Sequence, residues 1–258
     1  MKLKYAALSI SFLCLCTLQG ATIQNGDFAT GDLTGWTKSG NVFPAANPTT
    51  GLVNVLPDST LWGGFTNFPL PGVLSGGNYA EISNGVGGVN LVPIQDFSML
   101  TTGLYFVTPG GGGTISFLYN LLTDEFPTGA DYGKFSVLDA SNQELSSTLY
   151  PISAIDQNGG CTEVAAPDGT TICAASGWIQ QTFSLAAFEG QNVKFAFSVW
   201  DAASSDTPDN SIDSALLLAN VQATGLDVPG RNLPEPATFV LGGSALLAFS
   251  LLRRRAHR

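Results

Sequence analysis

Short segments in which apolar and polar residues alternate constrain the fold of this chain most. In residues 132–138, Phe135 and Val137 alternate with polar neighbours, and in residues 193–199 every odd-numbered position is Val or Phe. A period of two is typical of a β-strand with one buried face. Glycine, proline, asparagine and aspartate separate these segments, and long amphipathic helical patterns are absent. The pattern predicts an all-β fold, a β-sandwich.

Nine segments fit this pattern and give the expected strands. They are residues 52–56, 79–83, 99–107, 113–122, 132–138, 144–150, 178–185, 193–199 and 214–223. Within residues 113–122, Ile115, Phe117 and Tyr119 are expected on one face. We also expect Trp36, Trp178 and Trp200 to pack in the core. Residues 22–230, called the body below, are enough for one domain with a substantial core.

The opening of the body carries a more specific cue. Residues 23–28 read Ile-Gln-Asn-Gly-Asp-Phe, and Trp36 follows eight residues after Phe28. This opening is similar to the first strand of galactose-binding-like jelly rolls and related carbohydrate-binding modules. The resemblance implies a jelly-roll-like sandwich in which Phe28 and Trp36 pack in the core or at its edge. In such domains the closing strand often ends in Asp-Asn-Val, but Ala219 stands here in place of the aspartate, which disfavours a calcium site that uses that carboxylate.

The last 26 residues consist of three parts in a fixed order. They are the motif Pro234, Glu235 and Pro236, the uncharged residues 237–252, and the cluster Arg253, Arg254 and Arg255. As a helix, the uncharged run would be roughly 24 Å long, somewhat short for a hydrocarbon core of about 30 Å. Snorkelling of Arg253 or local thinning of the bilayer can accommodate the difference. The pattern predicts one transmembrane helix with the arginines in the cytoplasm, and the alternative is a buried C-terminal helix.

This tail resembles the PEP-CTERM sorting signal of Gram-negative bacteria. The resemblance implies that the chain is a substrate of an exosortase, a membrane transpeptidase that cuts near Pro234, Glu235 and Pro236. Those three are then recognition residues and not catalytic ones. It also implies an intermediate anchored in the inner membrane, followed by transfer to the cell surface or the extracellular matrix. Residues 115–135 are similar to the choice-of-anchor ectodomains that carry such tails.

The N-terminus has the features of a secretory signal peptide. Lys2 and Lys4 precede an apolar stretch, residues 5–18, and the small residues Gly20 and Ala21 offer a cleavage point. The Sec translocon and signal peptidase are the expected partners. A lipoprotein signal is the alternative because two cysteines lie in this segment, but the residues before them fit a lipobox poorly. The expected organisation is a signal peptide at 1–21, an ectodomain at 22–228 and a sorting signal at 229–258.

Two cysteines remain in the exported body. Cys161 and Cys173 enclose eleven residues. In an oxidising compartment such an isolated pair is expected to form a disulfide, which stabilises by about 3 kcal/mol for a loop of this size. A two-cysteine metal site is the alternative, and no histidine is present in the body to complete it.

The charge of the body restricts its partners and its chemistry. Residues 22–230 hold three lysines against nineteen carboxylates, a net charge of −16, and contain neither histidine nor arginine. Such a surface repels nucleic acid. The composition excludes Ser-His-Asp and Cys-His triads, histidine-ligated metals and arginine clamps on phosphate. A glycosidase remains open because it needs only two carboxylates, about 5–10 Å apart.

Calcium is the ion that the composition favours, since it binds carboxylate and carbonyl oxygens. The candidate ligands are Asp27, the cluster Asp124, Glu125 and Asp131, and the loop residues Asp201, Asp209 and Asp213. Solvated acidic loops are the alternative. Trp62 lies in a stretch rich in glycine and proline and is the candidate sugar contact, because an exposed indole can stack on a sugar ring.

Together these features indicate an exported, non-enzymatic component of the cell surface or matrix that interacts weakly with exopolysaccharide. The alternative is a calcium-dependent carbohydrate-binding module, and a carboxylate-based glycoside hydrolase comes third. Genomic neighbourhood is the observation that would separate these roles best.

Overall fold

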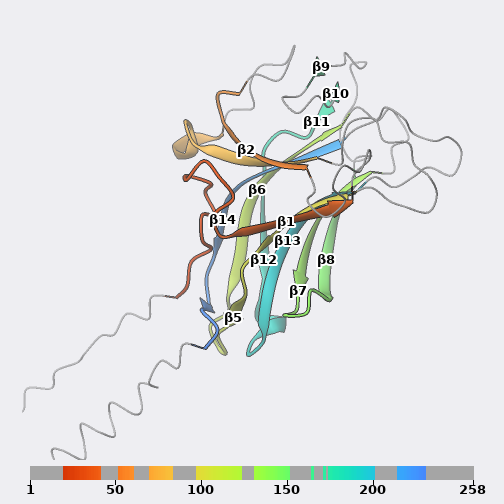
Figure 1. Ribbon diagram of the computed structural model, residues 1–258. Helices are drawn as coiled ribbons and strands as arrows, with labels where there is room; N and C mark the ends of the chain where they lie inside the picture. Colours follow the sequence, from red (N-terminus) through yellow and green to blue (C-terminus); the bar gives the residue numbers. More distant parts are fainter. Residues whose placement is uncertain are drawn as a thin grey trace, which may run out of the picture.

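The fold consists of antiparallel strands (Figure 1). The computed structural model describes residues 20–41, 52–60, 70–83, 97–123, 131–151, 164–165, 171–172, 174–200 and 214–230. The longer strands are β1 (Trp36–Asn41), β2 (Leu52–Pro57), β3 (Asn78–Ser83), β4 (Phe97–Thr102), β6 (Thr114–Thr123), β7 (Tyr132–Leu138), β8 (Glu144–Pro151), β12 (Ile179–Ser184), β13 (Asn192–Trp200) and β14 (Ser214–Ala223). The shorter elements are β5 (Tyr105–Val107), β9 (Val164–Ala165), β10 (Thr171–Ile172), β11 (Ala174–Ala175), β15 (Leu226–Asp227) and the 3-10 turns η1 (Gly72–Leu74) and η3 (Ala186–Phe188). Over these ranges, no helix has the length and apolarity to span a bilayer.

Two sheets form the sandwich. In the first sheet the strands follow the order β8-β7-β13-β4-β1, and β5 continues the β4 side of β13, with β15 beside it. In the second sheet the order is β12-β6-β14-β3-β2, with β11 next to β12 along β6. All of these pairings are antiparallel, which is the arrangement of a jelly-roll-like sandwich. The all-β sandwich expected from the alternating segments is confirmed.

The main core fills the space between the sheets. Every odd-numbered residue from Val193 to Val199 of β13 is buried at 0–1% exposure, as the period of two predicts. Phe117 of β6 meets Phe197 of β13 edge to face, with ring centroids 4.8 Å apart, and Phe135 of β7 lies 5.3 Å from Phe197. An aromatic cluster therefore joins the two sheets at their centre.

Part of the outer face of the second sheet is buried as well. Leu118 and Leu217 point away from the main core and form a second cluster with Tyr79. Leu70 is buried in this cluster, and Trp178 packs edge to face on Tyr79 at 5.7 Å. This cluster covers the part of the outer face around Tyr79. Further along the same face, Gln222, Ser116 and Thr182 form a partly exposed polar row on β14, β6 and β12.

The two ends of the described body lie at one pole of the sandwich. The amide of Ala21 donates to the carbonyl oxygen of Leu226 in β15 at 2.7 Å, and β15 pairs with β5 at the lower end of the view in Figure 1. From this pole β13 runs for nine residues, about 30 Å, to Trp200. Trp200 therefore lies at the pole opposite the points where the chain enters and leaves the body.

Most strands agree with the alternation in the sequence. β7 and β14 have the expected bounds, and β6 carries Ile115 and Phe117 into the core as predicted. The expected strand at residues 99–107 is instead two strands, because the chain breaks at Gly103 between β4 and β5. Trp36 is in the core as expected, but Trp200 is half-buried on the outer face of the first sheet and lies outside the main core.

Candidate functional site

A row of three aromatic rings crosses the outer face of the first sheet at the pole of Trp200. The register places Trp200 of β13 directly opposite Phe97 of β4 on one side and Tyr132 of β7 on the other. The preceding residue, Val199, is buried in the core, so Trp200 points to the outer face. All three residues of this aromatic row are half-buried.

The rings of the aromatic row stand on edge. Phe97 and Trp200 are stacked at a centroid distance of 4.4 Å and an angle of 11°, and Tyr132 is parallel to Trp200 within 7° at 6.3 Å. Adjacent strands are about 4.8 Å apart, so rings stacked across strands present their edges to the exterior. Phe97 covers one face of the Trp200 ring, and the Nζ of Lys134 lies 5.8 Å from the centroid of the Trp200 ring. The row is therefore an apolar ridge that presents ring edges to the exterior, and Asn41 of β1 and Pro151 of β8 lie directly across from its two ends.

An ion pair lies next to the aromatic row. Lys134 Nζ and Glu144 Oε2 are 2.5 Å apart, and the hydroxyls of Ser147 and Ser136 donate to the same carboxylate at 2.7 and 3.1 Å. Partial burial acts to raise the pKa of Glu144, but the hydrogen bond from Lys134 and those from the two serines hold it below its usual value. Glu144 is thus ionised at neutral pH. Burial, followed by the charges of Glu144 and Asp131, raises the pKa of Tyr132.

Small side chains continue this face toward the middle of the sheet. Thr101, Ala196, Ser136 and Ser198 point outward from three neighbouring strands and are nearly buried between their larger neighbours. The hydroxyl of Ser198 accepts a hydrogen bond from the Trp200 indole at 2.8 Å, which fixes the ring. The face therefore combines a partly exposed apolar ridge and one ion pair above a floor of buried small side chains, and the ridge and the carboxylate are groups that can contact a hydroxyl-rich ligand.

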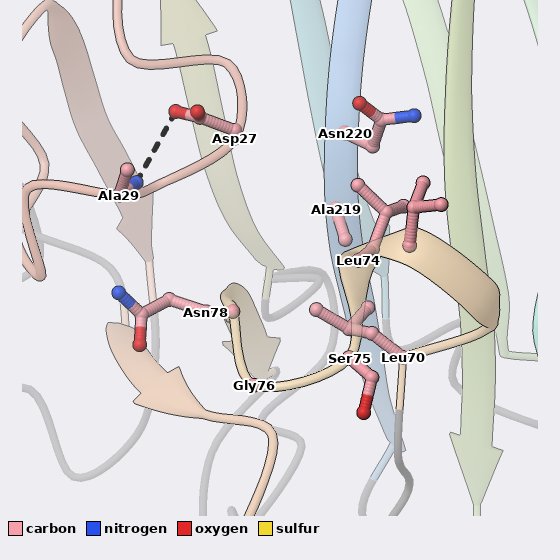
Figure 2. Close-up of a pocket in the computed structure, with 11 residues that line it drawn as sticks. Asp27, Ala29, Leu70, Leu74, Ser75, Gly76, Asn78, Ala219 and Asn220 are labelled. Atoms are coloured by element: carbon pink, nitrogen blue, oxygen red, sulfur yellow. Dashed lines mark hydrogen bonds between the residues drawn. The ribbon is translucent and has the colours of Figure 1, made fainter.

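A separate cavity of about 290 Å³ lies beside the opening motif (Figure 2). Asp27, Asn78 and Asn220 supply its polar groups, and Leu70 and Leu74 supply apolar walls. Each polar group already has a local partner. Asp27 accepts from the amide of Ala29 at 3.2 Å, Asn78 donates to the carbonyl oxygen of Phe28 at 2.9 Å, and Asn220 accepts from Gln222 at 2.6 Å.

The described residues around Asp27 do not assemble a calcium site, and Asp201, Asp209 and Asp213 lie outside the described ranges. Ala219 lines the same cavity, in the place where the resemblance would put an aspartate, so Asp27 is the single carboxylate in the lining. Calcium takes six to eight oxygen ligands, usually with several carboxylates among them. Nowhere among the described residues do three acidic, histidine or cysteine side chains gather. Asp131 is buried directly before β7.

Many of the predicted site residues lie outside the described ranges. These are Trp62, Asp124, Glu125, Cys161, Cys173, Asp201, Asp209, Asp213, Pro234, Glu235, Pro236, Arg253, Arg254 and Arg255. The disulfide, the sorting motif, the membrane span and the Trp62 contact therefore stay predictions.

The sequence contained a signal for the aromatic row that our prediction missed. In the alternation of residues 193–199 the odd positions are apolar, so an even position such as 200 belongs to the opposite face. By the same alternation, Tyr132 lies on the other face of its strand from Phe135 and Val137. Alternation within each strand could not show that the three rings meet, however, because their contact depends on the pairing of β13 with both β4 and β7.

Comparison with known proteins gives no family for this chain. The sequence matches no protein-family model, and no curated protein matches it either. Among solved structures, it is similar to the K1 cleaved adhesin domain of Lys-gingipain from Porphyromonas gingivalis W83, with 15% identity, a TM-score of 0.44, and coverage of 80% of this chain and 99% of that one.

Two carbohydrate-binding modules are also similar. One is a family 61 module solved with β-1,4-galactotriose, with 12% identity, a TM-score of 0.41, and coverage of 79% of this chain and 97% of that one. The other is the family 11 module of Clostridium thermocellum solved with a mixed-linked tetrasaccharide, with 13% identity, a TM-score of 0.35, and coverage of 79% and 95%. Likenesses at this level do not transfer a ligand or an activity.

Proposed function

We propose that this chain is an exported, non-enzymatic protein of the bacterial cell surface or matrix, sorted by an exosortase, that contacts polysaccharide through the outer face of its first sheet. The observation that carries the binding part is the aromatic row at the pole of Trp200. The sorting part rests on the order of the motif, the uncharged run and the arginines in the tail.

The placement of the two poles supports this proposal. The chain leaves the body next to β15, at the pole where Ala21 bonds to Leu226. A C-terminal anchor would hold this pole nearest the membrane, and the aromatic row would then face away from it, roughly 30 Å further out. A matrix polysaccharide would thus meet the ridge first.

The electrostatics of the face favour binding over hydrolysis. A glycosidase acid needs a raised pKa so that it holds a proton at neutral pH. Glu144 has a lowered pKa because Lys134 and two serine hydroxyls stabilise its ionised form. Glu144 is therefore suited to accept hydrogen bonds from sugar hydroxyls and unsuited to protonate a leaving group.

The sorting part is tested by replacing Pro234, Glu235 and Pro236 together with alanine in the full chain. The variant is expected to stay in the membrane fraction at its unprocessed mass, whereas the native chain appears at the surface as a shorter product. Alanine at Asn232 and Leu233, which lie just before the motif, is the matched control and should leave processing unchanged. Equal processing of the motif variant and the native chain would reject exosortase sorting.

The binding part is tested by affinity electrophoresis in gels that contain the host's exopolysaccharide. Trp200→Ala removes the centre of the aromatic row and is expected to weaken binding by about tenfold, equivalent to ~1.4 kcal/mol. Val73→Ala, at an exposed apolar position on η1, serves as the control and should retain native mobility. Trp62→Ala forms a third arm. Loss of binding with Trp62→Ala but not with Trp200→Ala would contradict the proposed face.

A further inference from the structure

One lateral side of the sandwich ends in two long edge strands. In the part of the chain that the structure describes, β7 is the one strand that pairs with β8, and β6 is the one that pairs with β12. The two edges lie on the same side, because Tyr150 of β8 contacts Tyr119 of β6 with ring centroids 4.4 Å apart and Phe135 of β7 contacts Phe183 of β12 at 5.4 Å. Every second residue of an edge strand turns its amide and carbonyl groups away from the sheet, so these edges offer hydrogen-bonding groups to another strand.

The middle of β8 lacks the features that usually prevent edge pairing. Such features occur only at its ends, where a bulge lies next to Glu144 and the strand finishes at Pro151. Residues 145–150 between them read Leu-Ser-Ser-Thr-Leu-Tyr, with no charge, glycine or proline. Leu149 is 54% exposed on the outer face, and Leu145 is 42% exposed. An edge of this length and composition is a template for a further strand.

The opposite side of the sandwich is protected. β1 carries Lys38, which lies across from the core residue Leu100 and is nevertheless exposed, so a charge stands on the inward side of this edge. β2 ends at Pro57. An inward-facing lysine is one of the features by which natural sheets avoid edge association, and β8 has no counterpart to it, whereas β2 and β8 both end in a proline. Within the described ranges, the β8 edge therefore lacks the inward charge that protects the β1 edge.

Charge favours a second copy of the same chain as the partner at this edge. The exported body carries −16, so two copies repel each other over most of their surfaces. On the β8 side, β12 has no charged residue, and the one charge of β8, Glu144, is neutralised by Lys134 at 2.5 Å. Two copies that approach by this side therefore bring no unpaired charge of β8 or β12 against each other. An antiparallel strand can pair with itself about a two-fold axis, which closes the contact as a dimer.

We propose that β8 pairs antiparallel with β8 of a second copy, so that the two first sheets join into one sheet across the dimer. The paired backbones would bury the edge groups of residues 145–150, and Leu149 would pack against the partner's outer face. Because β8 borders the outer face of the first sheet, the two aromatic rows would lie on one continuous surface. The pairing does not depend on sorting or on glycan binding.

Cysteine cross-linking in the full chain tests this pairing. Near a two-fold axis, side chains directly opposite each other have Cβ atoms about 5 Å apart, so single cysteines there are close to disulfide range. Under mild oxidation, at least one of Ser147→Cys, Thr148→Cys and Leu149→Cys should give a band at twice the chain mass on a non-reducing gel. Val73→Cys, which is fully exposed elsewhere, should give no more than the native chain does.

A second substitution separates edge pairing from chance collision. Adding Leu149→Lys to the Ser147→Cys or Thr148→Cys variant that cross-links best places a charge on the edge and should abolish the dimer band, whereas adding Val73→Lys should leave it. Protease resistance of each variant shows that it is folded. Absence of cross-linking at all three positions, or a dimer band that persists with Leu149→Lys, would overturn the proposal, as would cross-linking of β8 only to another protein.

Discussion

Replacing Phe197 by alanine is expected to lower the free energy of unfolding by about 3–5 kcal/mol, the range for deleting a buried phenylalanine side chain. Phe197 is 1% exposed at the centre of β13, which pairs with β4 and β7. Its ring contacts Phe117 across the sandwich, Phe135 on the next strand and Trp36 near the opening, at centroid distances of 4.8, 5.3 and 6.1 Å. The alanine variant would leave a cavity where the two sheets meet.

Urea denaturation followed by tryptophan fluorescence measures this loss. Since domains of this size are stable by only about 5–15 kcal/mol, the variant should unfold at a clearly lower urea concentration. Phe197→Leu keeps most of the volume and should cost less than about 1.5 kcal/mol. Lys194→Ala, on the same strand but on the outer face, removes two exposed hydrogen bonds to the β7–β8 turn and should cost no more than about 1 kcal/mol. A Phe197→Ala midpoint equal to that of Lys194→Ala would contradict the placement of this core.

The strands could be predicted where alternation is strong and local. Residues 132–138 and 214–223 were predicted with the bounds that the structure shows, because each reads as one strand within a single window. The break at Gly103 could not be predicted, because it depends on a partner. β13 pairs with β4 through residues 196–200 and with β5 through residues 192–193, so the segment must divide there.

The candidate site was harder to predict from the sequence than the strands were. Exposure of Trp200 depends on which strand face the second sheet covers, and this is a property of the assembled sandwich. Trp62 was chosen because it lies in a stretch rich in glycine and proline, a pattern that indicates exposure but does not show which residues lie beside it in the fold. The stacking of Phe97, Trp200 and Tyr132 arises from register between strands that are far apart in the chain. Pattern reasoning within one segment cannot supply such a register.

Gly26→Ala is expected to destabilise the fold by about 3 kcal/mol, at the upper end for inserting a methyl group into a packed site. A Cβ at residue 26 would lie 2.0 Å from the carbonyl oxygen of Val221, a backbone atom that cannot move aside alone. The Val221 amide also donates to the Gly26 carbonyl oxygen at 2.7 Å. The substitution would therefore push the opening turn away from β14 and break this hydrogen bond.

The conformation of the turn around Gly26 explains why its backbone lies so close to Val221 of β14. Asn25 and Phe28 flank the glycine with φ angles of 50° and 54°, a left-handed conformation that is rare for phenylalanine. Packing compensates for the strain, since Phe28 is fully buried and stacks on Trp36 at 5.4 Å. The opening motif thus fastens the first described segment to β14, which is a structural role.

Two controls separate this structural role from a ligand role. Gly103→Ala has no atom within 4 Å of the added Cβ and should change the free energy of unfolding by less than about 1 kcal/mol. Asp27→Ala removes the exposed carboxylate of the same motif and should stay within about 0.5 kcal/mol, with or without calcium. If the motif served mainly to hold an ion at Asp27, the order would be reversed. Asp27→Ala would then be the damaging variant in calcium, and Gly26→Ala would unfold at the native urea concentration.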